Sequence, residues 1–429
     1  MTAAAKPGAE GSLADWLNYQ EQLHPAAIEM GLGRVRVVAE RLELVAAPPL
    51  SVIVGGTNGK GSTTTLLAAI YREAGYRVGA YTSPHLYRYN ERVAVDGVAA
   101  SDAALCAAFA AIEQARGDIS LTYFEFGTLA ALWLFREAQV TVQVLEVGLG
   151  GRLDAVNLLD ADAAVVTNIG LDHQDWLGDN RDAIGREKAG IFRRGRLAVI
   201  ADRDPPAGLL EAAQSYGARV QRLDAGDFGY TATASDFQWQ SAELKSPPLP
   251  LPALLGAHQL DNAAAAIAVV QGLQCRLPVA WSAVASALQG LYLPGRVQPH
   301  GRFVLDVAHN TEAVQQLVQT LSTRFGAERC LLLIGVLGDK PVEAMAALLR
   351  PLVQQAIAVQ LPGPRAIPDT ELAARLTACG IASEAGGAAA HALALALLRA
   401  DAAQPILVCG SFLTVAAIAP LIVDDCTDD

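Results

Sequence analysis

The chain has 429 residues, of which 52% are hydrophobic and 18% charged, and its formal net charge is −12. This length predicts two or three domains with substantial cores, and the acidic balance without a long basic run argues against nucleic-acid binding. No apolar run approaches the roughly 20 residues of a membrane-spanning helix, so we expect no membrane partner.

The six cysteines are scattered along the chain and form no C-x-x-C pair. We interpret them as reduced thiols of the core. The N-terminal residues also lack the hydrophobic centre of a signal peptide. We therefore expect a cytoplasmic protein.

Short apolar runs alternate with helical patterns in the first part of the chain. Strands are predicted at 52–54, 78–81, 140–147, 163–167 and 197–200, with helices that include 62–74 and 126–138. Continuous apolar strands that alternate with helices predict a parallel sheet covered on both faces.

A second series of strands is predicted at 303–307, 330–335, 356–360 and 406–409, with helices at 370–378 and 388–400. The fold class is therefore α/β, with a P-loop parallel-sheet domain followed by a smaller Rossmann-like α/β domain. The proline-rich run at 247–252 resembles a linker, but a helix at 262–272 follows it before any new strand. We therefore place the boundary near Gly295, which gives domains of 1–295 and 296–429.

The segment at residues 51–65 reads SVIVGGTNGKGSTTT, an apolar strand followed by a glycine-rich turn and a lysine. Such glycines let backbone N–H groups approach a phosphate closely, the following helix presents its positive N-terminus, and Lys60 adds a full charge. Ser62 or Thr63 offers a hydroxyl to a bound Mg²⁺. Gly61 separates the lysine from the hydroxyls, unlike the usual P-loop, and a glycine-rich turn with a solvated lysine is the alternative. We interpret the segment as a nucleoside triphosphate site.

Two other predicted strands end in groups that suit a metal ion. Glu146 closes the strand at 140–147, where a carboxylate beside a P-loop strand holds nucleotide-bound Mg²⁺; a solvent-facing strand end is the alternative. His173 follows the strand at 163–167, and a structural hydrogen bond is the alternative to metal binding, with Mn²⁺ also a suitable ion. Lys188, between Glu187 and an alanine, is interpreted from its neighbours as a solvated or ion-paired surface charge.

A set of motifs in order along the chain is similar to the folylpolyglutamate synthase/dihydrofolate synthase family of the Mur ligase superfamily. The resemblance spans nearly the whole chain and rests on GTNGKGS (56–62), SPHL (83–86), RYNERV (88–93), LTYFEFGTLAALWLF (121–135), EVGLGGRLDAVN (146–157), LDHQDWLG (171–178), REKAGIF (186–192), LPGR (293–296), DVAHN (306–310) and GSFLTV (410–415). GTNGKGS alone indicates the superfamily, whereas SPHL, TYFEF and GLGGRLDA together point to the folate branch.

The resemblance implies ATP-dependent amide formation through an acyl phosphate, with L-glutamate as the amine. It implies both addition of glutamate to dihydropteroate and extension of the glutamate tail of tetrahydrofolate. The first domain would bind ATP and the pterin, and the second would bind glutamate. The implied cofactors are ATP and Mg²⁺ at two sites, and the implied assembly state is a monomer.

The resemblance also implies site residues. Nucleotide would be bound by Gly56, Thr57, Asn58, Gly59, Lys60, Gly61, Ser62, Asn262, Arg296 and Asp306. Metal would be held by Ser83, Glu146 and His173, and Lys188 would be carbamylated and ligate a second Mg²⁺. The pterin pocket would be lined by Glu29, Met30, Gly31, Thr122, Tyr123, Phe124, Glu125, Leu153, Asp154 and Ala155. Catalysis would depend on Lys60, Lys188, His173 and His309.

One position departs from the family pattern, because Thr311 stands where a proline usually follows HN. We expect this threonine to cap the following helix in place of the proline. Two other functions remain as rivals. One is a superfamily ligase that joins amino acids to a cell-wall precursor, but this function would not explain the TYFEF and GLGGRLDA motifs. The other is a regulatory P-loop protein, which would turn over ATP independently of glutamate.

Overall fold

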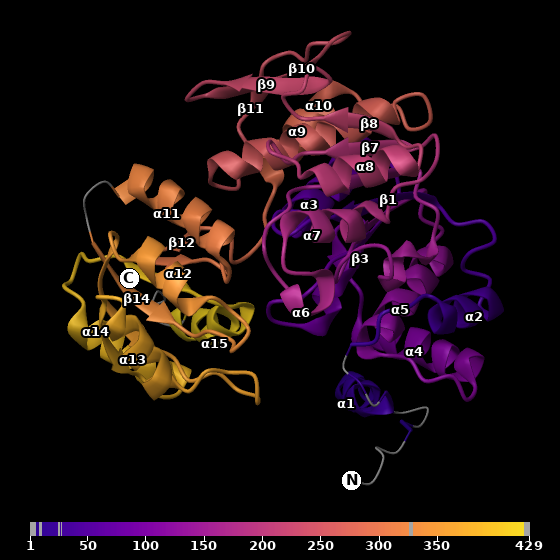
Figure 1. Cartoon of the computed structure of the whole chain (residues 1–429). Helices are drawn as coiled ribbons and strands as arrows, with labels where there is room; N and C mark the ends of the chain where they lie inside the picture. The colour runs from indigo at the N-terminus through magenta and orange to yellow at the C-terminus, as the bar shows by residue number, and fades with distance from the viewer. Residues whose placement is uncertain (1–5, 8–10, 25, 27, 326–328, 424–429) are drawn as a thin grey trace. The chain divides into compact units, whose positions relative to one another are not determined.

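The structure is a computed structural model that describes residues 6–7, 11–24, 26, 28–325 and 329–423 (Figure 1). The chain forms two compact units. The first consists of Met1–Ala253 with Leu260–Leu291, and the second of Leu254–Gln259 with Tyr292–Asp429. The chain therefore leaves the first unit, returns to it, and leaves it again.

The first unit is built on an eight-stranded sheet with the order β4-β3-β2-β5-β1-β6-β7-β8. Its strands are β1 (Leu50–Gly55), β2 (Val78–Tyr81), β3 (Val93–Val95), β4 (Val98–Ala99), β5 (Val142–Glu146), β6 (Ala163–Val166), β7 (Leu197–Ile200) and β8 (Arg219–Arg222). Strands β2, β5, β1, β6, β7 and β8 pair in parallel. The first five of these are the predicted strands, and β8 was not predicted. Strands β3 and β4 pair antiparallel at one edge.

The helices of this unit are α1 (Leu13–Leu23), α2 (Gly33–Arg41), α3 (Lys60–Glu73), α4 (Asp102–Arg116), α5 (Tyr123–Glu137), α6 (Gln174–Leu177), α7 (Arg181–Ala189), α8 (Ala207–Ser215) and α10 (Trp281–Gly290), with the 3₁₀ turns η1 (Tyr89–Arg92) and η2 (Ala155–Leu158). Most of these helices follow strands, whereas α1 and α2 precede β1 and pack against α4 and α5. Helix α9 (Ala257–Gly272) begins in the second unit and ends in the first. The central strands are buried because helices pack on them, which explains their continuous apolar character.

A three-stranded antiparallel sheet follows in the first unit, formed by β9 (Phe228–Ala232), β10 (Asp236–Ser241) and β11 (Leu249–Pro250). The short strand β11 pairs only with β10 and lies inside the proline-rich run at 247–252. Proline lacks a backbone donor and is tolerated at a sheet edge, so this run is an edge strand and not a linker.

The second unit contains a six-stranded sheet with the order β12-β13-β17-β14-β15-β16. Its elements are β12 (Gln298–His300), β13 (Phe303–Leu305), β14 (Cys330–Ile334), β15 (Val353–Ala358), β16 (Ala382–Ala385), β17 (Ile406–Cys409), α11 (Thr311–Phe325), α12 (Val342–Leu349), α13 (Asp369–Ala378), α14 (Ala389–Arg399) and α15 (Phe412–Val423). Five strands are parallel, and β12 is an antiparallel edge. Each unit thus has the α/β architecture that the alternation of elements predicts.

The buried side chains form a separate cluster in each unit. Cys330 and Cys409 are buried in the second unit, in agreement with the interpretation of the cysteines as core thiols. Cys275 is exposed, so that interpretation is wrong for this residue. Cys426 lies outside the described residues.

Candidate active site

The parallel order β5-β1-β6 brings three predicted segments to one edge of the sheet. Strand β1 leads into the glycine-rich turn, β5 ends at Glu146, and the loop after β6 carries His173. The carboxyl ends of parallel strands meet at the same edge, which is where open α/β sheets bind their ligands. The predicted nucleotide and metal residues of the first unit therefore share this edge.

The glycine-rich turn is held open by the neighbouring loop. Asn168 accepts hydrogen bonds from the backbone N–H of Thr57, through its carbonyl at 2.9 Å, and of Asn58, through Oδ1 at 2.7 Å. Thr167 Oγ1 donates to the Asn58 carbonyl at 2.6 Å. Loop β6–α6 thus fixes the turn that leads into α3, whose first N–H groups have no acceptor within the helix.

Gly59 is the N-cap of α3 and has φ +84, a left-handed conformation that favours glycine. A Cβ at Gly59 would lie 2.5 Å from Asn262 Oδ1, so a side chain there has no room. The structure therefore brings Asn262, on α9, against the predicted phosphate loop. Sequence spacing alone could not place a residue about 200 positions away.

Lys60 and Lys188 meet at one carbonyl oxygen. Lys60 Nζ donates to the carbonyls of Gly56 at 3.2 Å and Thr57 at 3.1 Å, and Lys188 Nζ donates to the same Gly56 carbonyl at 2.8 Å. Lys188 is buried with 5% of its surface exposed. The interpretation of Lys188 as a solvated surface charge, made from its sequence neighbours, is therefore wrong.

The burial of Lys188 has a local cause in the close packing of α7 on the loop after β5. A Cβ at Gly151 would lie 2.8 Å from the Lys188 carbonyl, so glycine permits this approach. Burial is the main cause that lowers the pKa of Lys188 to about 7, and the positive charge of Lys60 contributes to this shift. Near neutral pH this amine is therefore present in both its charged and its neutral form.

Ser83 and Glu146 lie together at the ends of β2 and β5. The Ser83 backbone N–H donates to Glu146 Oε2 at 3.0 Å, and Glu146 is 4% exposed. A hydroxyl beside a buried carboxylate is a donor set that suits a hard divalent cation. In the first turn of α3, Thr63 Oγ1 is also buried and has no hydrogen-bond partner among the described residues.

His173 lies on the loop after β6 and is the N-cap of α6. It has φ +52, an uncommon backbone conformation for a residue other than glycine, and it is exposed. The structure places it at the same edge of the sheet as Glu146. An uncommon backbone conformation next to predicted ligand residues fits a functional loop.

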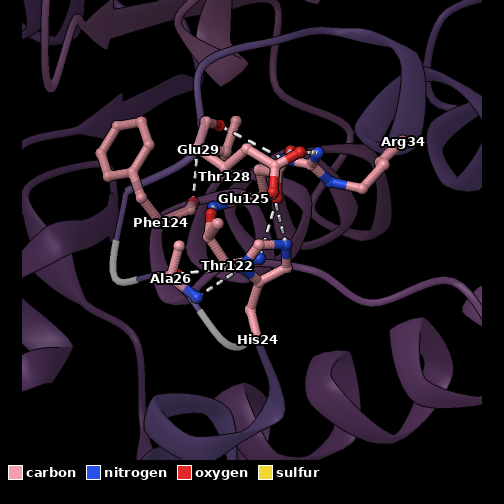
Figure 2. A network of polar contacts seen from close by, with 8 residues as sticks. All are labelled: His24, Ala26, Glu29, Arg34, Thr122, Phe124, Glu125 and Thr128. Atoms are coloured by element: carbon pink, nitrogen blue, oxygen red, sulfur yellow. Dashed lines mark hydrogen bonds and ion pairs between the residues drawn. The ribbon is translucent and has the colours of Figure 1, made fainter. Parts of the chain in front are cut away.

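Three segments are predicted to line the pterin pocket, residues 29–31, 122–125 and 153–155, and we call them the pterin segments. Figure 2 shows the polar contacts between the first two, at the start of α5. Thr122 and Glu125 form a capping box, in which Glu125 Oε2 accepts from the Thr122 N–H at 2.8 Å. Glu125 Oε1 accepts from Arg34 Nη2 at 3.1 Å, and Arg34 also pairs with Glu29. Glu29 is thereby joined to the Thr122–Glu125 turn.

The third pterin segment follows Gly150. Met30 lies beside this glycine, because a Cβ on Gly150 would be 3.3 Å from Met30 Cε. Phe124 lies against Gly148 in the same way. Leu153 is half-buried and Ala155 is buried at the start of η2. The structure thus brings residues 29–30, 122–125 and 148–155 together, although Gly31 makes no close contact of this kind.

Asp154 is the N-cap of η2 and is buried. Its carboxylate accepts hydrogen bonds from the N–H groups of Leu149 at 2.8 Å and Val156 at 3.0 Å. Burial raises the pKa of Asp154 to about 6, and these backbone hydrogen bonds act against the rise. This carboxyl could accept or donate a hydrogen bond to a ligand near neutral pH.

The second unit places Arg296 and His309 beside Phe412, and the charge of Arg296 acts on Asp306. The Arg296 guanidinium lies 5.3 Å from the centre of the Phe412 ring, and the His309 ring centre lies 6.1 Å from it. Asp306 is buried, accepts from the Val297 and Ala308 N–H groups at 2.8 Å each, and has a pKa raised by burial. An aromatic ring beside an arginine is a surface on which a planar base can stack.

The prediction that Thr311 caps α11 is wrong. Asn310 Oδ1 accepts from the Ala313 N–H at 2.9 Å, so Asn310 is the N-cap and Thr311 is the first residue of the helix. The sequence interpretation also missed Arg34, Asn168 and Phe412. Phe412 lies inside the GSFLTV motif, which was a usable signal. Arg34 and Asn168 carry no motif of their own, and only the fold places them.

Among the described residues, no helix combines the length and the apolar character that crossing a membrane requires.

Two family models match the chain. Residues 54–270 match the Mur ligase middle domain, and residues 295–412 match the Mur ligase glutamate ligase domain. The chain is 43% identical over 425 residues to the dihydrofolate synthase/folylpolyglutamate synthase of Escherichia coli strain K12, which covers 98% of each sequence.

Solved structures are similar over the same length. E. coli FolC in complex with DHPP and ADP has a TM-score of 0.92 and 43% identity, covering 98% of this chain and all of that one. A bifunctional folylpolyglutamate synthase/dihydrofolate synthase with Mn, AMPPNP and L-glutamate bound has a TM-score of 0.89 and 42% identity, with 98% and 100% coverage.

Proposed function

The chain belongs to the dihydrofolate synthase/folylpolyglutamate synthase family of Mur ligases, and we propose how its own residues carry out the ligation. The reaction is the ATP-dependent joining of L-glutamate to folate substrates. Dihydropteroate becomes dihydrofolate, and tetrahydrofolate gains further glutamates. A carboxylate is a poor electrophile at neutral pH, so it first takes the γ-phosphate of ATP and releases ADP. The glutamate amine attacks this acyl phosphate, and the tetrahedral intermediate collapses to the amide and phosphate.

The observation that carries the residue assignment is the pair of lysines on the Gly56 carbonyl, beside the N-terminus of α3. Lys60 would turn from this carbonyl to the β- and γ-phosphates and neutralise their charge as the phosphoryl group is transferred. Residues 56–62 would cradle the phosphates, with Asn262 beside them. Arg296, Asp306 and His309 would contact the rest of the nucleotide, which the ring of Phe412 supports by offering a stacking surface.

Ser83, Glu146 and His173 would hold the divalent metal, because a hydroxyl, a buried carboxylate and an imidazole are oxygen and nitrogen donors at one edge of the sheet. When bound, the ion neutralises phosphate charge and clamps the reacting oxygens. That the reaction uses ATP and a divalent metal follows from the family, because a similar enzyme has been solved with AMPPNP and Mn bound. Magnesium as the working ion, and a second metal position, are our proposals.

Lys188 would be carbamylated. Its neutral amine attacks CO₂, forming an N–C bond and losing a proton, so that a cation becomes a carboxylate. The lowered pKa supports this reaction because only the unprotonated amine is nucleophilic. The new carboxylate would lie beside Lys60, which favours its negative charge, and it would serve the second metal.

The pterin would bind where residues 29–31, 122–125 and 153–155 meet. Aromatic Phe124 supplies an apolar surface there, and Asp154 supplies a carboxyl that can exchange hydrogen bonds with the polar edge of a pterin. The carboxylate to be activated would then extend toward Ser83 and Glu146. We also propose a cytoplasmic monomer that binds no nucleic acid, and a functional division at residues 295 and 296, where the second family match begins.

The experiment is the measurement of phosphate release from ATP with Mg²⁺ and L-glutamate, with dihydropteroate or tetrahydrofolate as acceptor. Release that requires glutamate with both acceptors would support the bifunctional ligase. Release with tetrahydrofolate alone would reduce it to a tail-extending enzyme. Turnover that ignores glutamate and both acceptors would contradict the proposal and favour a regulatory P-loop protein.

A further inference from the structure

Arg34 joins two carboxylates that belong to different parts of the pterin segments (Figure 2). Its Nη2 donates to Glu125 Oε1 at 3.1 Å and to the Glu29 backbone carbonyl at 3.3 Å. Its Nη1 forms an ion pair with Glu29 Oε1. On the far side, His24 Nε2 lies 3.1 Å from Glu29 Oε2. The segment before α2 is therefore connected to the first turn of α5 through one guanidinium.

Glu125 depends on this guanidinium. Its side chain is only 5% exposed, and its second oxygen is already used by the Thr122 N–H in the capping box. A buried carboxylate that loses its cationic partner is left uncompensated, which is strongly unfavourable. It would then also lie near the charge of Glu29, which is 47% exposed and able to turn toward solvent. Removal of Arg34 would therefore release Glu29 rather than move α5.

The base of Arg34 is fixed by its helix. Helix α2 buries Val35 and Val38 and packs against α4 and α5, so the backbone of Arg34 has a set position relative to the Thr122–Glu125 turn. The Nε of Arg34 is itself buried and has no acceptor among the described residues. Buried donors normally have partners, and an exception in a binding region is consistent with a site that a ligand completes.

We propose that Arg34 is a positioning residue for the pterin substrate, which holds residues 29–31 against the start of α5 and so preforms this side of the pocket. The inference rests on the proposed pterin site. Its physical basis is preorganisation, because a segment already held in place loses less conformational freedom when the substrate binds. Arginine suits the role because its rigid planar fork presents donors on separate nitrogens to two carboxylates and a carbonyl, whereas all three donors of a lysine ammonium leave from one nitrogen.

The test compares Arg34→Ala and Arg34→Lys with Arg36→Ala. Arg36 lies on the same helix, is exposed, and its one hydrogen bond among the described residues goes to the Leu158 carbonyl at 3.3 Å, so it is a matched control. The measurements are the Kd for dihydropteroate, the Kd for ADP, and the kcat and the KM values for dihydropteroate, ATP and L-glutamate. We expect Arg34→Ala to raise the Kd and KM for dihydropteroate by about tenfold or more and to leave the Kd for ADP unchanged. Arg34→Lys should recover part of the loss, and Arg36→Ala should match the wild type.

Glu29→Gln provides a second variant that leaves the buried Glu125–Arg34 pair intact. It should also weaken dihydropteroate binding, and its effect should not add to that of Arg34→Ala, because both changes break the same connection. Equal dihydropteroate affinity in the wild type, Arg34→Ala and Glu29→Gln would overturn the inference, as would an equal loss of ADP affinity. If the wild type itself binds no dihydropteroate, the proposed function fails together with the inference, and this result is distinguishable from the others.

Discussion

Lys60 is held on the phosphate loop by two backbone carbonyls, so its charge is available at the place where a phosphate would sit. We predict that Lys60→Ala lowers the rate of glutamate-dependent ADP formation by roughly a hundredfold or more, the usual cost of losing one group that stabilises developing charge. The control is Lys245→Ala, because Lys245 is exposed. Near-normal turnover in the Lys60 variant would contradict the phosphate-loop assignment.

Lys188 gives a prediction that depends on pH. Burial lowers its pKa to about 7, so the amine is mostly neutral at pH 8 and mostly protonated at pH 6. Carbamate formation requires the neutral amine. At equal dissolved CO₂ we expect the initial rate of ¹³C incorporation, followed by NMR, to be roughly tenfold lower at pH 6 than at pH 8, the ratio of the neutral fractions.

The control for this measurement is Lys188→Ala, which should give no protein-bound carbamate signal at either pH. The same variant should lose ligase activity and regain part of it with added short carboxylic acids, which can replace the missing carboxylate. Equal rates of incorporation at pH 6 and pH 8 would contradict the role of the lowered pKa.

At the scale of single residues, sequence and fold contribute differently. The roles of Lys60 and Glu146 can be predicted from the neighbouring sequence, because each lies at or just beyond the carboxyl end of an apolar strand, where ligands bind. Lys188 cannot, because its burial depends on how α7 packs against Gly151, about 40 residues earlier in the sequence. The role proposed for Arg34 likewise depends on its contact with Glu125, 91 positions away, which the sequence does not show.

At the scale of elements, the capping box of α5 links stability to binding. Thr122 accepts from the Glu125 N–H at 3.2 Å and also begins the turn that would contact the pterin. We predict that Thr122→Ala lowers the free energy of unfolding by about 1 kcal/mol, the usual value of an N-cap. It should also weaken dihydropteroate binding several-fold, because the Thr122 hydroxyl no longer caps the first turn of α5, which carries proposed pterin residues.

Ser101→Ala is the matched control for this element. Ser101 caps α4 in the same way, through the Ala104 N–H at 3.2 Å, but α4 carries none of the proposed pterin residues. In denaturant unfolding, Ser101→Ala should lower the free energy of unfolding by a similar amount to Thr122→Ala. It should leave the affinity for dihydropteroate unchanged. If both variants weaken binding equally, the effect of Thr122→Ala is one of general stability and not of the site.

The parallel strands could be predicted because each is a continuous apolar run buried on both faces. The edge strands could not. Strand β8 has no fully buried residue, and β11 has two residues and includes a proline, so neither shows the pattern of a central strand. Helix α1 was missed although Ser12 and Asp15 form a capping box at its start, which is a readable sequence signal.

At the scale of the whole molecule, the two units have separate hydrophobic clusters, and all five tryptophans lie in the first unit, at positions 16, 133, 176, 239 and 281. Tryptophan fluorescence therefore reports the first unit alone, whereas far-UV circular dichroism reports both. If the units unfold independently, these two probes will respond differently to core substitutions in each unit.

We predict that Leu372→Ala in α13 shifts part of the circular dichroism transition to lower denaturant and leaves the fluorescence midpoint unchanged. Leu105→Ala in α4 should shift the fluorescence midpoint. Both leucines are fully buried, so each truncation should cost about 2–5 kcal/mol in its own unit. If instead Leu372→Ala also lowers the fluorescence midpoint, the chain unfolds as one cooperative body, because the first unit then depends on the second for its stability.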